Sequence, residues 1–176
     1  MLVYPAFLKE NMLKEIKERR SVRKYTDIPV TKEQVEDLLH AAMNAPSACN
    51  SQNWKFIATL KREDLDTIAS MPAHYSMAKD ASAAIIAMGE PGVEFGQFFE
   101  VNVAAAIENI LLEATHLGLG AVWCAIHPVK ERVECMRKAF DIDEKYVPVA
   151  VIVIGNPKEI PHKEDQYDDT KVIWRL

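Results

Sequence analysis

Cysteine and glycine are scarce in this 176-residue chain, which has three cysteines and six glycines. Cys49, Cys124 and Cys135 are odd in number, widely spaced and form no Cys-x-x-Cys pair. This pattern excludes a disulfide framework and the common zinc sites, and it is typical of a protein kept in a reducing cytoplasm. No apolar stretch follows basic residues near the N-terminus, so the sequence predicts no secretory signal peptide.

An excess of positive charge is also lacking, because 21 Lys and Arg face 26 Asp and Glu for a net charge of −5. This balance argues against non-specific binding to nucleic acid or to an acidic membrane. The five histidines show no metal-ligand spacing, and the chain contains no His-Glu-x-x-His, Gly-x-Ser-x-Gly or phosphate-cradling P-loop. With 49% apolar residues and no repeat or linker, residues 1–176 are predicted to form one domain.

Apolar periodicity predicts alternating helices and strands. Thr31 opens a Thr-x-x-Gln capping box, and Val35, Leu38, Leu39 and Ala42 follow at helical spacing until Pro46. By the same reasoning we expect helices over about 7–20, 61–71, 97–117 and from 128, and strands over 55–60, 83–88, 121–126 and 149–154. Periodicity alone leaves the choice between α+β and α/β open.

The predicted helix over 97–117 is apolar on nearly every face and would span about 30 Å. Its polar residues, among them Glu100, Asn102 and Glu108, argue against a membrane span. A second subunit is the favoured cover for this helix, and the core of a larger monomeric bundle is the alternative. The polar tail that ends in Val172-Ile173-Trp174 is predicted to be an arm that docks on that subunit; the alternative is a frayed terminus.

Two short stretches carry the functional prediction. The first, residues 19–25, reads Arg-Arg-Ser-Val-Arg-Lys-Tyr and concentrates cations in an acidic chain. Guanidinium groups bind phosphate oxygens in pairs, although a solvated basic turn is the simpler interpretation of this stretch alone. The second, residues 45–54, reads Ala-Pro-Ser-Ala-Cys-Asn-Ser-Gln-Asn-Trp. Both are expected in loops that flank the helix after Thr31, which can bring them to one pocket.

Together the two stretches resemble the FMN-dependent nitroreductase family, whose members carry Arg-Arg-Ser-x-Arg-x-Tyr/Phe and then Ala-Pro-Ser-x-x-Asn-x-Gln-Pro-Trp. The chain departs from this pattern at Asn53, where the family usually has proline. The similarity covers nearly the whole chain. It implies an α+β nitroreductase-like fold, with a central mixed or antiparallel sheet wrapped by helices. It also implies an intertwined homodimer with exchanged C-terminal arms.

The resemblance also implies contacts to a bound FMN. Arg19 and Ser21 would hold its phosphate with Arg20 close by, and Arg23 would approach N1 and O2 of the ring. Asn50 and Gln52 would hydrogen-bond the ring edge and the ribityl chain, unless they form only a self-capped polar turn. The remaining predicted contacts are Ser47, which could come from the other subunit; backbone amides of Ala125 and Ile126 near N5; and Lys163 at the phosphate, with Gln166 as the other late position.

The implied activity is the NAD(P)H-driven, ping-pong reduction of nitroaromatics, quinones or similar electron-poor acceptors. The flavin performs the redox chemistry, so no catalytic side chain is predicted. Cys49 is expected to neighbour the ligand without acting as a nucleophile. Residues 71–99 are expected to cover the pocket, with His74, Tyr75, Phe95 and Phe98 as candidates to stack on an acceptor. The alternatives are a non-catalytic flavin- or nucleotide-binding module, another flavin reaction such as reductive dehalogenation or flavin destruction, and a structural dimerisation domain.

Overall fold

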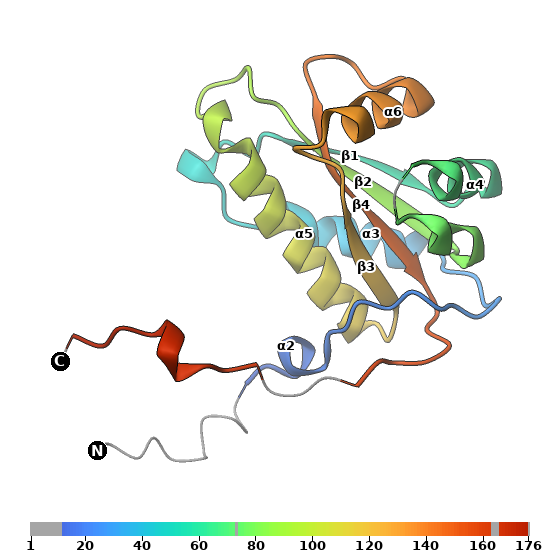
Figure 1. The fold of residues 1–176 in the computed structure, drawn as a ribbon, viewed down its shortest axis with the longest axis horizontal. Helices are drawn as coiled ribbons and strands as arrows, with labels where there is room; N and C mark the ends of the chain where they lie inside the picture. Colours follow the sequence, from blue (N-terminus) through green and yellow to red (C-terminus); the bar gives the residue numbers. More distant parts are fainter. Residues whose placement is uncertain (1–11, 73, 163–165, 176) are drawn as a thin grey trace.

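A four-stranded antiparallel sheet forms the centre of the computed structural model, which describes residues 12–72, 74–162 and 166–175. Its strands are β1 (Trp54–Thr59), β2 (Ala83–Gly89), β3 (Gly120–Ala125) and β4 (Val147–Gly155), in the spatial order β1-β2-β4-β3 (Figure 1). Every residue of β2 is buried, as its continuous apolar run predicts for a central strand. β3 lies at the edge of the sheet, a position that becomes important for the candidate site.

Helices cover both faces of this sheet. On one face α3 (Lys32–Met43) and α5 (Phe99–His116) pack with side chains such as Leu38, Ile107 and Ile152 in one apolar cluster. On the other face α4 (Arg62–Ser70) and α6 (Lys130–Phe140) pack with Ile68, Met136 and the alternate strand residues in a second cluster (Figure 1). The resulting three-layer α+β arrangement confirms the predicted fold class.

The helix starts follow local chemistry. In α3 the Thr31 hydroxyl accepts a hydrogen bond from the N–H of Gln34, and the Gln34 side chain accepts one from the N–H of Thr31, which completes the predicted capping box. α2 (Lys14–Glu18) is shorter than the predicted helix over 7–20, of which residues 7–11 lie outside the described residues. The chain leaves α2 in extended conformation at Arg19, so the arginine stretch itself is not helical.

α5 is buried on one side and partly uncovered on the other. Val103, Ile107 and Ile110 are fully buried against the sheet, whereas Val101 keeps 68% of its surface exposed. This uncovered side is the one for which the sequence predicts a second subunit. In the described part of the chain, no helix combines the length and apolar character that crossing a bilayer requires.

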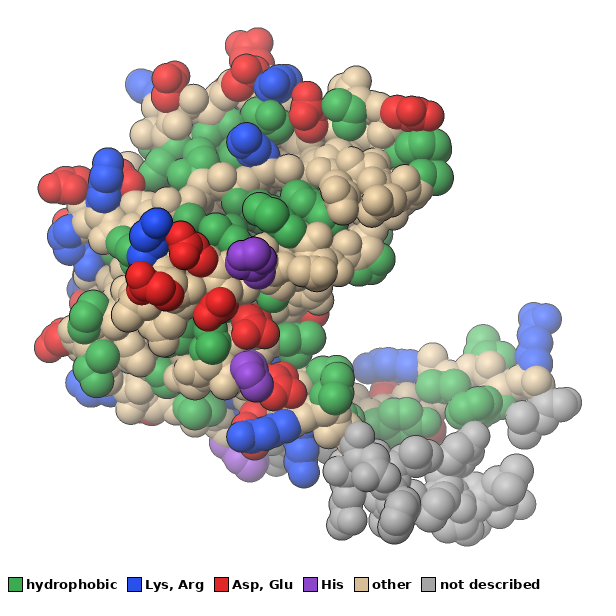
Figure 2. All heavy atoms as spheres, turned by 180° about the vertical axis from the view of Figure 1, so that it is seen from behind, with side chains coloured by type: hydrophobic (Ala, Val, Ile, Leu, Met, Phe, Trp, Pro, Cys, Tyr) green, Lys and Arg blue, Asp and Glu red, His purple; other side chains and the backbone are tan. Residues whose placement is uncertain are grey.

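The C-terminal part of the chain first returns along the arginine stretch and then leaves the body. After β4, Lys158 donates its N–H to the carbonyl oxygen of Lys24 at 2.9 Å, and Tyr25 forms a bridge with Pro157. Residues 166–175, which include the short 3-10 helix η4 (Asp169–Lys171), run away from the sheet (Figure 1). Hydrophobic side chains lie along this segment (Figure 2), and Ile173 is 88% exposed. The arm exchange stays a prediction.

Candidate functional site

The arginine stretch runs along the outer edge of β3. The N–H of Val22 donates to the carbonyl oxygen of Ala121 at 3.0 Å, and Ser21 and Ala121 form a parallel bridge. A Cβ atom at Gly120 would lie 2.6 Å from Cγ1 of Val22, so only glycine allows this approach. The stretch is therefore attached to the sheet as a short fifth strand segment, a pairing for which the sequence gives no signal.

Tyr25 anchors the end of the stretch. Its hydroxyl donates toward the carbonyl oxygens of Val22 at 2.8 Å and Val153 at 3.1 Å, and its ring packs against Gly155. Burial raises the pKa of the Tyr25 hydroxyl well above its usual range, so it stays a neutral donor. The family-pattern tyrosine thus has a structural role: it holds the arginine stretch against β4.

The three arginines have different surroundings. Arg20 donates to three carbonyl oxygens, those of Lys17 and Arg19 at 2.8 Å and of Pro161 at 3.0 Å, and so ties the end of α2 to the C-terminal segment. Arg19 pairs through Nε with Glu108 of α5 at 3.5 Å. Arg23 is exposed and, among the described residues, makes a single 3.4 Å hydrogen bond to the carbonyl oxygen of Ser21. Arg19 and Arg23 retain N–H groups for a ligand, whereas most of the donors of Arg20 are used within the chain.

The edge of β3 continues beyond this attachment toward Ala125. Ile126 donates its N–H to Val149 of β4 at 2.9 Å, and alternation along an antiparallel pair then directs the N–H of Ala125 outward. The side chain of Ile126 is fully buried. Of the two amides predicted to face a ligand, that of Ala125 lies on the free edge, and that of Ile126 is already paired within the sheet.

Two side chains not anticipated in these roles hold the carbonyl of Ala125. The hydroxyl of Tyr75 and the Nη1 group of Arg132 each donate to this oxygen at 3.0 Å. Tyr75 is only 2% exposed, so it positions the strand end and does not stack on an acceptor as the sequence suggested. Of the other acceptor candidates, His74 is exposed, Phe98 is 44% exposed and Phe95 is partly buried.

The second motif forms a strained loop between α3 and β1. Cys49, Asn50 and Gln52 adopt left-handed backbone conformations with φ of 50°, 55° and 45°. Each such non-glycine residue costs about 1–3 kcal/mol and persists only when its surroundings hold it. The N–H of Gln52 donates to Oγ of Ser47 at 3.0 Å, and Nε2 of Gln52 donates to Oδ1 of Asn50 at 3.2 Å. The loop holds the Asn50 and Gln52 amides at the surface, where a ligand can reach them.

Within the described residues of one chain, the two motifs contact different parts of α5. Arg19 pairs with Glu108 in the middle of α5, whereas the strained loop contacts Asn102 near the N-terminus of that helix. No hydrogen bond or ion pair joins the arginine stretch to residues 47–53 within the described ranges. Within one chain the two motifs therefore lie at different positions along α5.

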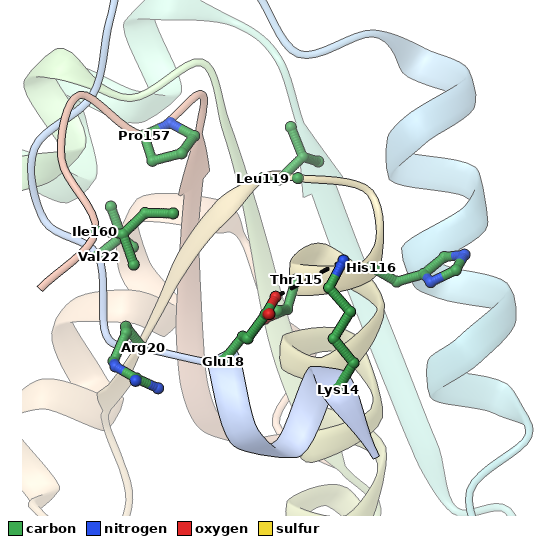
Figure 3. A pocket seen from close by; sticks show the side chains of 10 residues that line it. Lys14, Glu18, Arg20, Val22, Thr115, His116, Leu119, Pro157 and Ile160 are labelled. Atoms are coloured by element: carbon green, nitrogen blue, oxygen red, sulfur yellow. Dashed lines mark ion pairs between the residues drawn. The ribbon is translucent and has the colours of Figure 1, made fainter. Parts of the chain in front are cut away.

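A pocket of about 370 Å³ opens between α2, the end of α5 and residues 157–160, as Figure 3 shows. Two of its basic side chains already have acidic partners: Lys14 lies 3.9 Å from Glu18, and Nδ1 of His116 lies 3.1 Å from Glu15. Arg20, which also lines it, donates to backbone carbonyls. These pairings make the pocket a poor anion site, and we place the candidate site at the free edge of β3.

The remaining residues considered from the sequence are two late positions in the chain and two cysteines. Lys163 lies outside the described residues, and Gln166 is exposed on the C-terminal segment. Cys49 is exposed in the strained loop. Cys124 is buried beneath the arginine stretch, and this burial raises the pKa of its thiol to about 11, with the Arg23 charge acting weakly in the opposite direction. Cys124 is therefore a protonated core residue at neutral pH.

Comparisons with known proteins show which sequences and folds this chain is similar to. The sequence model of the Nitroreductase family matches residues 16–94 and 72–156. A Methanothermobacter thermautotrophicus protein with the provisional name NADH dehydrogenase/NAD(P)H nitroreductase is 40% identical over 93% of this chain and 86% of its own length. A Bacteroides thetaiotaomicron crystal structure with the same provisional name superposes with a TM-score of 0.86, at 36% identity and coverage of 91% of this chain and 94% of that one.

A further structure extends the comparison to a protein whose name includes a cofactor. The FMN-dependent nitroreductase of Clostridium difficile R20291 superposes with a TM-score of 0.85 at 26% identity. The match covers 92% of this chain and 98% of that one. The family match, the overall identity and the shared fold lead to one conclusion: the chain belongs to the nitroreductase family.

Proposed function

We propose that this protein is an FMN-dependent oxidoreductase that uses NAD(P)H to reduce nitroaromatics, quinones or similar electron-poor acceptors. The observation that carries the proposal is the attachment of the arginine stretch to the free edge of β3. It aligns cations, a hydroxyl and an outward amide along one edge. Relatives named for NAD(P)H nitroreductase and FMN-dependent activity support the same reaction class.

The donor set along this edge fits an elongated anionic ligand with a flat ring. Ser21 is bridged to Ala121, and Ala125 lies four strand residues further, a distance of about 13 Å at the usual rise of a strand. In the proposed arrangement Arg19 and Ser21 hold the phosphate, with Arg20 fixing the backbone beside them. Arg23 and the Ala125 amide then face the ring. Lys163 is the proposed late cation at the phosphate.

The proposed site is completed by a second protomer. Because the strained loop and the arginine stretch lie apart within one chain, we assign Ser47, Asn50 and Gln52 to the FMN of the partner. A groove of about 520 Å³ between α2, α3 and α5, lined in part by Leu13, Ile16 and Leu112, offers apolar surface for that contact. The partly uncovered side of α5 supports the same dimer.

The chain contributes binding and electrostatics to the reaction. FMN, when bound, supplies the redox chemistry by accepting a hydride from NAD(P)H and passing electrons to the acceptor. The fixed charge of Arg23 stabilises negative charge that develops on a ligand beside it. Protons are proposed to come from solvent. Donor and acceptor use one site in turn, which gives ping-pong kinetics. The three free cysteines suit the proposed cytoplasmic location.

The first test is the visible absorbance spectrum of the protein purified without added cofactor, followed by release and identification of any chromophore. We expect a flavin spectrum and released FMN, together with NAD(P)H oxidation that depends on a nitroaromatic or a quinone. Double-reciprocal plots should be parallel, and converging plots would contradict the ping-pong scheme. Bound FMN without NAD(P)H oxidation would identify a binding module instead. A colourless protein that takes up no FMN would overturn the proposed function.

A further inference from the structure

Asn102 is a buried polar residue on the otherwise apolar, sheet-facing side of α5. Only 4% of its surface is exposed, and its neighbours on that side include the fully buried Val103 and Ala106. A side-chain amide in such surroundings is tolerated because its polar atoms are paired. Its hydrogen-bond partners among the described residues all belong to the strained loop, which indicates that Asn102 acts on this loop.

Three hydrogen bonds connect Asn102 to the loop. Its Oδ1 accepts from the N–H of Ala48 at 3.0 Å, and its Nδ2 donates to Oγ of Ser51 at 3.2 Å and to Oδ1 of Asn53 at 2.9 Å. One side chain therefore holds the loop at its start, middle and end. Both N–H groups of the amide are used, which fixes its orientation.

Asn53 extends this network to the end of β2. Its Nδ2 donates to the carbonyl oxygen of Glu90 at 3.4 Å, and its own carbonyl oxygen accepts from the N–H of Glu90 at 2.9 Å. Asn53 is 6% exposed and stands where the family pattern has proline. A side chain that bonds both Asn102 and Glu90 replaces the conformational restriction of proline with a buried hydrogen-bond network.

We propose that Asn102 and Asn53 are positioning residues that keep the loop in its left-handed conformation, so that Asn50 and Gln52 present their amides to FMN. The inference rests on the proposed function. The left-handed residues Cys49, Asn50 and Gln52 all lie between the first and last bonds of the network. Without these bonds the loop relaxes to unstrained conformations, and the ligand must then restore order in the loop when it binds.

If the role of Asn102 were purely structural, its loss would lower stability without a specific effect on FMN binding. Asn109 provides the matched control for this alternative. Asn109 lies two turns further along α5, and its Nδ2 donates to the carbonyl oxygen of Ala41 at 3.0 Å. Asn102→Ala and Asn109→Ala both remove a side-chain amide that ties α5 to another element. Only the first disconnects the strained loop.

The experiment compares both variants with the wild-type protein after FMN removal. The readouts are the dissociation constant for added FMN from fluorescence quenching, the unfolding midpoint, and hydrogen exchange of the loop amides without flavin. For Asn102→Ala we expect at least tenfold weaker FMN binding and faster exchange across residues 48–52. Asn109 also lines the groove proposed for the dimer contact, so Asn109→Ala is compared at protein concentrations that keep it dimeric. There we expect FMN affinity within about twofold of wild type, because no contact to the ligand or its loop changes.

The outcomes separate this inference from the proposed function. Wild-type protein that binds no FMN would refute the proposed function itself. Wild-type binding with unchanged affinity and loop exchange in Asn102→Ala would overturn only the positioning role. If Asn102→Ala does not fold, Asn53→Ala decides, because it removes one of the three bonds to Asn102. We expect it to weaken FMN binding several-fold, and unchanged affinity would overturn the role of the network.

Discussion

Arg23 carries a charge that is not neutralised within the described part of the chain. Its guanidinium group makes one 3.4 Å hydrogen bond and no ion pair there, whereas the neighbouring Lys24 pairs with Glu159 at 2.7 Å. An unpaired fixed cation beside the strand edge interacts more strongly with an anionic ligand than with a neutral one. In the proposed site, Arg23 is therefore the residue expected to favour a reduced, anionic ring over an oxidised one.

Arg23→Gln should lower the reduction potential of bound FMN by about 30 mV, equivalent to ~1.4 kcal/mol for a two-electron couple. The expected change in reduction potential is small because solvent screens the charge of the exposed Arg23 side chain. The potential is measured by equilibration with a reference dye. Lys24→Gln is the control, and its potential should match the wild type. Equal potentials in Arg23→Gln and wild type would remove the electronic role of Arg23.

At the residue scale, the sequence selects candidate side chains by motif but does not show what they contact. The motifs selected Arg19, Ser21, Asn50 and Gln52, because residue type and spacing carry that pattern. The paired amide of Ile126 and the buried hydroxyl of Tyr75 follow from strand pairing and packing between distant segments. Such contacts leave no local pattern in the chain. Asn102 was hidden for the same reason: its partners lie about fifty positions away.

At the element scale, the attachment of the arginine stretch to β3 depends on Gly120. A Cβ atom there would meet Cγ1 of Val22 at 2.6 Å and Cβ of Val22 at 2.8 Å. Val22 is buried and its N–H is bonded to Ala121, so it has little room to move. A methyl group at this position must displace the stretch from the strand edge.

Gly120→Ala should lower the free energy of unfolding by about 1–3 kcal/mol, as overpacking of a close contact does. FMN binding should weaken with it, because the displaced stretch carries Arg19, Ser21 and Arg23. Urea unfolding and FMN titration measure the two effects. Gly92→Ala is the control, since a Cβ atom there meets no atom within 4 Å, and its stability should stay within about 0.5 kcal/mol. A Gly120→Ala protein with unaltered stability would show that the edge is not tightly packed.

The elements themselves were largely predictable from the sequence. Apolar runs predicted β2, β3 and β4, and alternation in a β-prone stretch predicted β1, each to within two residues. Burial on both faces explains the continuous apolar runs of β2 and β4. The capping box gave the start of α3. The sequence could not order the strands as β1-β2-β4-β3 or place residues 19–25 on the edge of β3, because strand pairing is a choice among distant partners.

At the scale of the whole molecule, the proposed two-protomer site couples FMN binding to dimerisation. In each chain the arginine stretch contacts the middle of α5, and the strained loop contacts its N-terminal part. The side chains of Val101 and Ile173 are exposed. Exposed apolar side chains on a helix face and on a projecting segment mark an interaction surface. If two protomers complete each site, FMN binds only the dimer and therefore stabilises it. By the same linkage, a substitution that weakens the dimer must also weaken FMN binding.

We therefore expect the protein in solution to have twice the 19.9 kDa mass of one chain. Ile173→Asp should weaken the dimer, so that its FMN binding depends on protein concentration. Dilution of this variant should release FMN and yield monomers together, as followed by light scattering and flavin fluorescence. Ile28→Asp, which changes a 61% exposed isoleucine before α3, should remain dimeric and retain FMN. Flavin retention by a monomeric Ile173→Asp protein would mean that one chain holds the cofactor alone. The assignment of Ser47, Asn50 and Gln52 to the partner's site would then fail, while the roles of Arg19, Ser21 and Arg23 would stand.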